Sequence, residues 1–104
     1  MEAADVENTV RVYIEREIVP RLPDQIFVVS YEIVSWLIQV HTYQRSVLHW
    51  EPREELEQFV EALVGELPPR PDEAWQCTLR SHRVFDDQSP TIEGVQVYAR
   101  PAEV

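Results

Sequence analysis

The fold depends on residues 25–50, which read QIFVVSYEIVSWLIQVHTYQRSVLHW. Ile, Val, Thr, Phe, Tyr and Trp are frequent in this segment, and neither Ala nor Lys occurs in it, a composition that favours strand. From Val34 to Val40 the residues at even positions are apolar and alternate with Ser, Leu and Gln, as expected for a strand with two faces. We therefore predict strand here, divided in two by a bend or irregular turn near Ser30–Glu32.

A helix over the same segment is the alternative. The chain between Asp24 and Pro52 contains no Gly, Pro, Asn or Asp, so a tight hairpin has no obvious turn residue. A helix would have one polar stripe, formed by Glu32, Ser35, Gln39, Thr42 and Ser46. The chain would then contain three helices and a hairpin, an order that resembles the winged-helix arrangement.

Helices are predicted on both sides of this segment. Residues 3–19 have apolar side chains at three- and four-residue steps, and Pro20 ends the pattern. Residues 52–66 start with Pro52 and have Glu residues in the first turn, where the helix dipole favours negative charge. Their expected buried side consists of Leu56, Phe59, Val60, Leu63, Val64 and Leu67.

The C-terminal third is predicted to form a hairpin. Residues 74–84 and 94–100 both alternate between apolar and polar, and residues 85–91 between them are typical of a turn. The predicted fold is a single α+β domain, residues 1–104, with two layers. In it, helices 3–19 and 52–66 lie on an antiparallel sheet formed by 25–48 and the hairpin 74–84/94–100.

Charge excludes several functions. The 104 residues include 19 acidic and 9 basic ones, all nine Arg, so the net charge is 9 − 19 = −10. Such a chain repels nucleic acid and anionic membranes. In the winged-helix alternative the third helix would contact DNA, yet it has five Glu residues from Glu51 to Glu61 and the single Arg53. We expect no direct binding of nucleic acid.

Composition also indicates the compartment. A single Cys forms no internal disulfide, which suits a reducing compartment. The first ten residues, MEAADVENTV, lack the apolar run of a signal peptide. The most apolar stretch, Ile26–Val40, is interrupted by Ser, Glu and Gln, unlike a membrane span. The prediction is a cytoplasmic protein that does not bind a membrane.

The residues with reactive side chains form no catalytic or metal motif. They are His41, His49, Cys77 and His82. Cys77 and His82 lie an odd number of residues apart on one predicted strand, so their side chains are expected on opposite faces. The spacing fits no metal motif, and there is no Gly-rich phosphate loop or nucleophile elbow. We expect no enzymatic activity and no cofactor; the alternative is a small enzyme or ligand-binding domain that uses His41, His49 and Cys77.

Protein binding is the leading hypothesis. Residues 51–73 contain eight acids and two Arg, a net charge of 2 − 8 = −6. We predict docking on a basic protein, as inhibitors, immunity proteins and chaperones do, since an acidic field speeds association with such a partner. The predicted partner-binding residues are Glu54, Glu55, Glu57, Glu61, Asp86, Asp87 and Trp50.

A dimeric structural or assembly subunit is the other alternative. In one unbroken alternation from residue 27 to 43, apolar side chains would occupy both faces of the sheet. One face would have Phe27, Val29, Tyr31, Ile33, Leu37 and Tyr43, and the other Val34, Trp36, Ile38 and Val40. A partner, including a second copy of the chain, would be needed to cover the second face.

Overall fold

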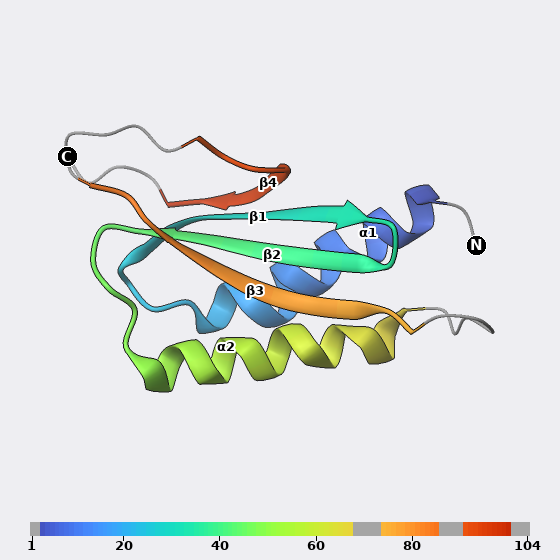
Figure 1. Ribbon diagram of the computed structural model, residues 1–104, viewed down its shortest axis with the longest axis horizontal. Coiled ribbons are helices and arrows are strands. Elements are labelled where there is room, and N and C mark those ends of the chain that lie inside the picture. Colours follow the sequence, from blue (N-terminus) through green and yellow to red (C-terminus); the bar gives the residue numbers. More distant parts are fainter. Residues whose placement is uncertain (1–2, 68–73, 86–90, 101–104) are drawn as a thin grey trace.

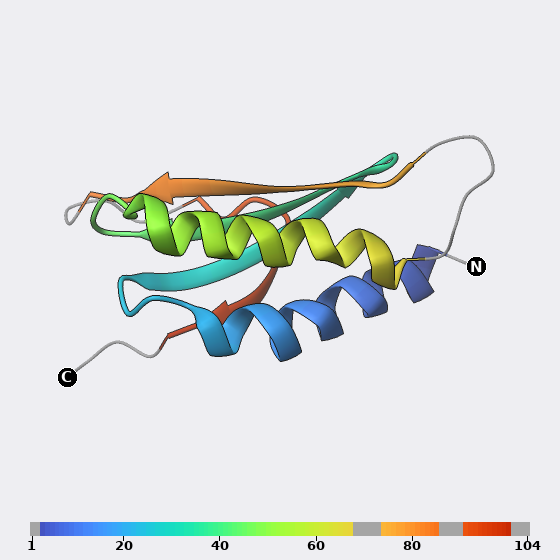
Figure 2. The same ribbon diagram turned by 90° about the horizontal axis from the view of Figure 1, so that it is seen from below.

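The computed structural model describes residues 3–67, 74–85 and 91–100. Its helices and strands are α1 (Ala3–Tyr13), β1 (Ile26–Val34), β2 (Leu37–Gln44), α2 (Trp50–Ala62), β3 (Gln76–Arg83) and β4 (Val95–Ala99). Both helices pack on one side of the four-stranded sheet and lie side by side there (Figures 1 and 2). The predicted α+β class is therefore confirmed.

Both predicted helices are present. A π-helical segment, Ile14–Ile18, and a 3₁₀ turn, Val19–Arg21, continue α1, and the chain leaves helical geometry at Leu22, shortly after Pro20. The second helix begins at Trp50, two residues before the predicted start, and a 3₁₀ turn, Leu63–Glu66, continues it. The proline-rich run at 68–71 lies outside the described residues.

The segment 26–44 is strand, as favoured, but its turn is not where it was predicted. The chain reverses at Ser35 and Trp36, with Val34 paired to Leu37, and Ser30–Glu32 lies inside β1. Ser35 takes a left-handed backbone conformation, with φ of 53°. Such turns usually have Gly or Asn at this position, and Ser35 is neither, so the residue types around it do not indicate a turn.

The two-residue turn also changes which side chains share a face. Because the strands pair antiparallel, Ile33 lies opposite Ile38 and Tyr31 opposite Val40, so these apolar residues point to the same side. The predicted separation of Val29, Tyr31 and Ile33 from Ile38 and Val40 is therefore wrong. All of these strand residues pack in one core with residues of the helical segments. The helical residues of this core include Val10, Ile14, Leu56, Val60 and Leu63.

The C-terminal strands exist, but the predicted hairpin between them is wrong. β3 pairs parallel with β2 after the crossover through α2, and β4 pairs antiparallel with β1 at the opposite edge. The sheet order is β3-β2-β1-β4, so the sheet is mixed and not antiparallel throughout. Pairing with β1 places Val97 and Tyr98 of β4 against the main core, which a hairpin with β3 would not do.

The described parts of the connection between β3 and β4, residues 84–85 and 91–94, contact the face of the sheet that the helices leave open. Val84 and Ile92 from this connection pack against Phe27, Val28 and Tyr43 in a second, smaller apolar cluster. We call this side the open face.

Among the described residues, no helix combines the length and the apolar character needed to cross a membrane.

Candidate functional site

The first candidate surface is on the outer side of α2. Trp50, Glu54, Glu57 and Glu61 are spaced by four, three and four residues, so they follow one line along the helix. We call this line the α2 stripe. The core residues Leu56, Val60 and Leu63 are on the other side of the helix, against the sheet. The described segment 50–66 has six Glu and one Arg, a net charge of 1 − 6 = −5.

Few positive groups neutralise this helix. Arg53 pairs with Glu57, with Arg53 Nε 3.1 Å from Glu57 Oε1. Arg16, in the π-helical segment after α1, pairs with Glu66, with Arg16 Nη2 3.6 Å from Glu66 Oε1. Glu54 and Glu61 are exposed and have no ion pair within the described part of the chain. Trp50 is 70% exposed. The α2 stripe thus combines uncompensated carboxylates with a large aromatic ring open to solvent.

The other predicted partner-binding residues divide between two places. Glu55 is exposed on α2 but points away from the α2 stripe, beside Glu51, because it is one residue out of step with Glu54. Asp86 and Asp87 lie outside the described residues. The structure therefore brings Trp50, Glu54, Glu57 and Glu61 together on one line, a grouping that helical periodicity alone allows one to find.

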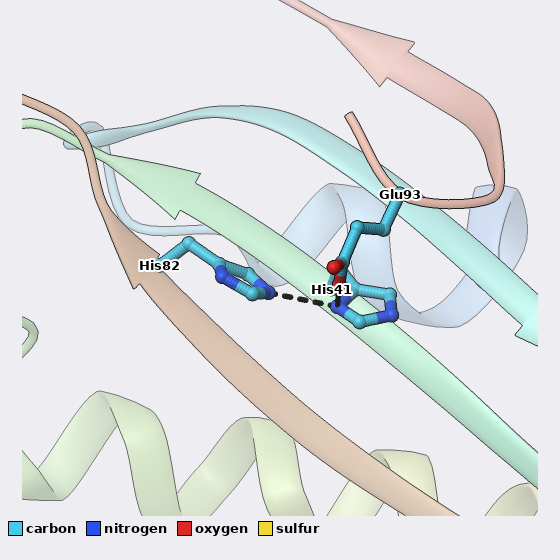
Figure 3. A group of neighbouring side chains, drawn as sticks. All are labelled: His41, His82 and Glu93. Carbon is cyan, nitrogen blue, oxygen red and sulfur yellow. Dashed lines mark hydrogen bonds and ion pairs between the residues drawn. The ribbon is translucent and has the colours of Figure 1, made fainter. Parts of the chain in front are cut away.

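The second candidate site is a polar cluster on the open face, shown in part in Figure 3. His41 from β2 and His82 from β3 point toward each other, and Glu93 reaches over them from the connection before β4. His41 is 0% exposed. Glu93, in the described segment before β4, covers it on the open face.

Hydrogen bonds fix the orientation of the buried ring. His41 Nε2 lies 2.6 Å from Glu32 Oε1, and because a carboxylate only accepts, the ring proton is on Nε2. In the neutral ring Nδ1 is then an acceptor, and it lies 2.8 Å from His82 Nε2. The same Nδ1 lies 3.5 Å from Glu93 Oε2. His82 and Glu93 therefore meet at Nδ1 of the buried His41 ring, while Glu32 holds the ring at its other nitrogen, Nε2.

The connection that carries Glu93 is held to the sheet through its backbone. Ser30 Oγ donates to the Glu93 carbonyl at 2.6 Å, and the Glu93 N–H donates to Tyr43 Oη at 2.9 Å. Gly94 follows, with φ of 77°, and a Cβ there would lie 2.0 Å from the Tyr31 carbonyl oxygen. Only Gly allows this close approach, so Gly94 sets the height of Glu93 above the sheet.

The second imidazole is positioned by stacking. The His82 and Tyr43 rings are 4.7 Å apart between centroids and nearly parallel, at 12°. Burial, together with the neighbouring His41 and Arg80, lowers the pKa of His82, and the carboxylates of Glu93 and Glu32 oppose this only in part. A lowered pKa favours the neutral ring, the form that can accept a proton or bind a metal.

The remaining reactive residues do not join the cluster. His49 is exposed at the start of α2. Cys77 pairs with Ile38 and belongs to the core, so the prediction that Cys77 and His82 lie on opposite faces is confirmed. Sequence reasoning missed Glu32 and Glu93, because their approach to His41 depends on strand register and on where the segment before β4 lies. Comparison with protein-family models, curated proteins and solved structures gave no match for this chain.

Proposed function

We propose that this protein is a small non-enzymatic binding module that docks on a basic protein through the α2 stripe. The observation that carries the proposal is Trp50, a 70% exposed ring on the same line as Glu54, Glu57 and Glu61. Exposed Trp residues are enriched among the anchors of protein interfaces. A cytoplasmic location, with no direct binding of nucleic acid or membrane, completes the proposal.

Charge and apolar surface have different roles in such a docking. The carboxylates attract a basic partner over a distance of about 10 Å at an ionic strength near 0.1 M, and salt weakens this attraction. The Trp50 ring provides area that is desolvated on contact and holds the partner in place. Affinity should therefore fall with salt and with loss of the ring, and the two effects should be separable.

The test is a pull-down from the native host's lysate at low and high salt, with mass spectrometry as the readout. Trp50→Ala and a triple variant of the α2 stripe, Glu54→Gln, Glu57→Gln and Glu61→Gln, are compared with the unmodified chain. The matched control removes the same charge from exposed positions of the first helical region, with Asp5→Asn and Glu7→Gln in α1 and Glu15→Gln in the π-helical segment that continues it.

We expect a basic protein that is retained at low salt, released at high salt, lost with both α2 variants and kept with the α1 control. Equal retention by the α1 and α2 variants would show that only net charge matters and would refute docking at the α2 stripe. Retention of nothing but the chain itself would instead support the dimeric alternative.

A further inference from the structure

We propose that His41, His82 and Glu93 bind one transition-metal ion of the Zn²⁺ class on the open face. The proposal concerns a different surface from the α2 stripe and does not depend on it. It rests on three potential ligand atoms, one from each residue, that all lie within 4.8 Å of one another. Two imidazole nitrogens and one carboxylate oxygen are typical ligands of zinc sites that keep a coordination position open.

The hydrogen bond from His41 to Glu32 prepares His41 to be a ligand. Metal-binding histidines commonly donate the N–H of their second ring nitrogen to a carboxylate, which fixes the tautomer and raises the basicity of the ligand. Here Nε2 donates to Glu32 at 2.6 Å. The lone pair of Nδ1 is thereby directed at His82 and Glu93, where the ion would bind.

The distances require only a small adjustment. Two ligands of a tetrahedral zinc ion, each about 2.0–2.1 Å from the metal, are roughly 3.3 Å apart. His41 Nδ1 lies 2.8 Å from His82 Nε2 and 3.5 Å from Glu93 Oε2. The two rings must separate by about 0.5 Å to admit the ion, and the Glu93 side chain, 53% exposed, is free on its solvent side to adjust.

Neighbouring residues fix the positions of the proposed ligands, and the cluster is accessible to solvent on one side. Tyr43 stacks on His82, and the backbone of Glu93 forms hydrogen bonds with the side chains of Ser30 and Tyr43. His41 is buried, His82 is half-buried and Glu93 is exposed, so the cluster opens to solvent at Glu93. With three protein ligands, the fourth position would face this opening and bind water or a small anion.

The donor set also excludes other ions. Mg²⁺ and Ca²⁺ prefer oxygen ligands and would gain little from two imidazoles. We expect the many surface carboxylates of this chain to bind such ions weakly and without selectivity, and that background must be separated from the site. Excess Mg²⁺ in every measurement saturates the surface carboxylates and leaves the nitrogen ligands available.

The test measures Zn²⁺ binding to the metal-free full chain in competition with a chromophoric chelator, and the visible absorption of added Co²⁺. Because His41→Ala would leave Glu32 without its buried partner, the ligand variants are His82→Gln and Glu93→Gln. His49→Gln is the matched control, since His49 is exposed at the start of α2, which covers the opposite face of the sheet. Glu32→Gln tests the supporting carboxylate.

We expect one Zn²⁺ per chain, Co²⁺ bands of a tetrahedral site, and unchanged binding by His49→Gln. Glu32→Gln should weaken binding about 10- to 100-fold, and each ligand variant by about 100-fold or more. Binding that is equal in the ligand variants and the control, or no Zn²⁺ bound in the presence of Mg²⁺, would overturn the proposal. The two histidines would then form only an internal hydrogen bond.

Discussion

The chemistry open to a residue on β3 depends on which face of the sheet it occupies. Cys77 and His82 are five positions apart, and side chains alternate between faces along a strand. Cys77 therefore enters the main core, 7% exposed, while His82 joins the polar cluster of the open face. This separation was predictable from sequence because it depends only on local strand geometry.

The buried environment of Cys77 leads to a prediction about alkaline pH. Burial raises the pKa of the thiol from 9.0 to about 11. Since the unfolded thiol ionises first, the unfolded state loses its proton at lower pH than the folded state. The free energy of unfolding should therefore fall as the pH rises from 9 toward 11, and the buried thiol should react slowly with thiol reagents in the folded protein.

Urea unfolding across this pH range measures the effect, with Cys77→Ala as the comparison. The variant lacks the thiol, so its stability should decline less steeply with pH, whatever its stability at neutral pH. Parallel decline of the two proteins, or rapid labelling of the native thiol at pH 8, would contradict the assigned burial.

The burial of His41, unlike that of Cys77, could not be predicted from its position in the sequence. It depends on residues 91–94, which are fifty or more positions away and lie over the sheet because β4 pairs with β1. Glu93 belongs to the cluster for the same reason. Residue-level chemistry was thus predictable where a single strand determines it and not where long-range topology does.

At the scale of elements, the hairpin of β1 and β2 shows what propensity can and cannot predict. The β-branched and aromatic composition correctly indicated strand for 26–44. The turn at Ser35 and Trp36 has no Gly or Asn, so its position was missed. A shift of one residue in strand register moves a side chain to the other face of the sheet. The wrong turn position therefore also assigned to opposite faces side chains that share one core.

The connection into β4 yields a prediction at the same scale, based on the two glycines of the chain. Gly94→Ala should lower the free energy of unfolding by about 2 kcal/mol or more, because φ is positive and the new Cβ would meet the Tyr31 carbonyl. Gly65→Ala is the control: its Cβ would meet nothing within 4 Å, and φ is not positive.

Urea unfolding of both variants checks this prediction. Gly65→Ala should be neutral or stabilising by about 0.5 kcal/mol, since Ala restricts the unfolded chain. Gly94→Ala should also weaken any Zn²⁺ binding, because it displaces Glu93. Similar stabilities for the two variants would mean that the connection does not approach β1 as closely as described.

For the molecule as a whole, the order of strands in the sheet was the part least accessible to sequence. The alternation in 74–84 and 94–100 predicts two strands equally well whether or not they pair with each other. The order is decided by the parallel pairing of β3 with β2 through α2 and by the pairing of β4 with the other edge of β1, and both are tertiary features. Net charge, in contrast, is set by composition alone.

The charge of −10 has opposite consequences for folding and for docking. Like charges three or four positions apart along α2, such as Glu51 and Glu55 or Glu57 and Glu61, repel each other by roughly 0.2–0.5 kcal/mol per pair. Salt screens this repulsion, as the Debye length falls from about 30 Å at 0.01 M to about 10 Å at 0.1 M. The folded chain should therefore become more stable by up to about 1 kcal/mol over this range, while affinity for a basic partner falls.

Urea is the appropriate denaturant for this comparison, because it adds no charge. The triple variant Glu54→Gln, Glu57→Gln and Glu61→Gln should be less sensitive to salt in both measurements, since it removes repulsion within α2 and attraction to the partner together. If added salt instead destabilises the unmodified chain, the ion pairs Arg53–Glu57 and Arg16–Glu66 contribute more than the repulsion does. Glu57 and Glu66 would then be stabilising the fold, and the negative charge at these two positions would need no partner to explain it.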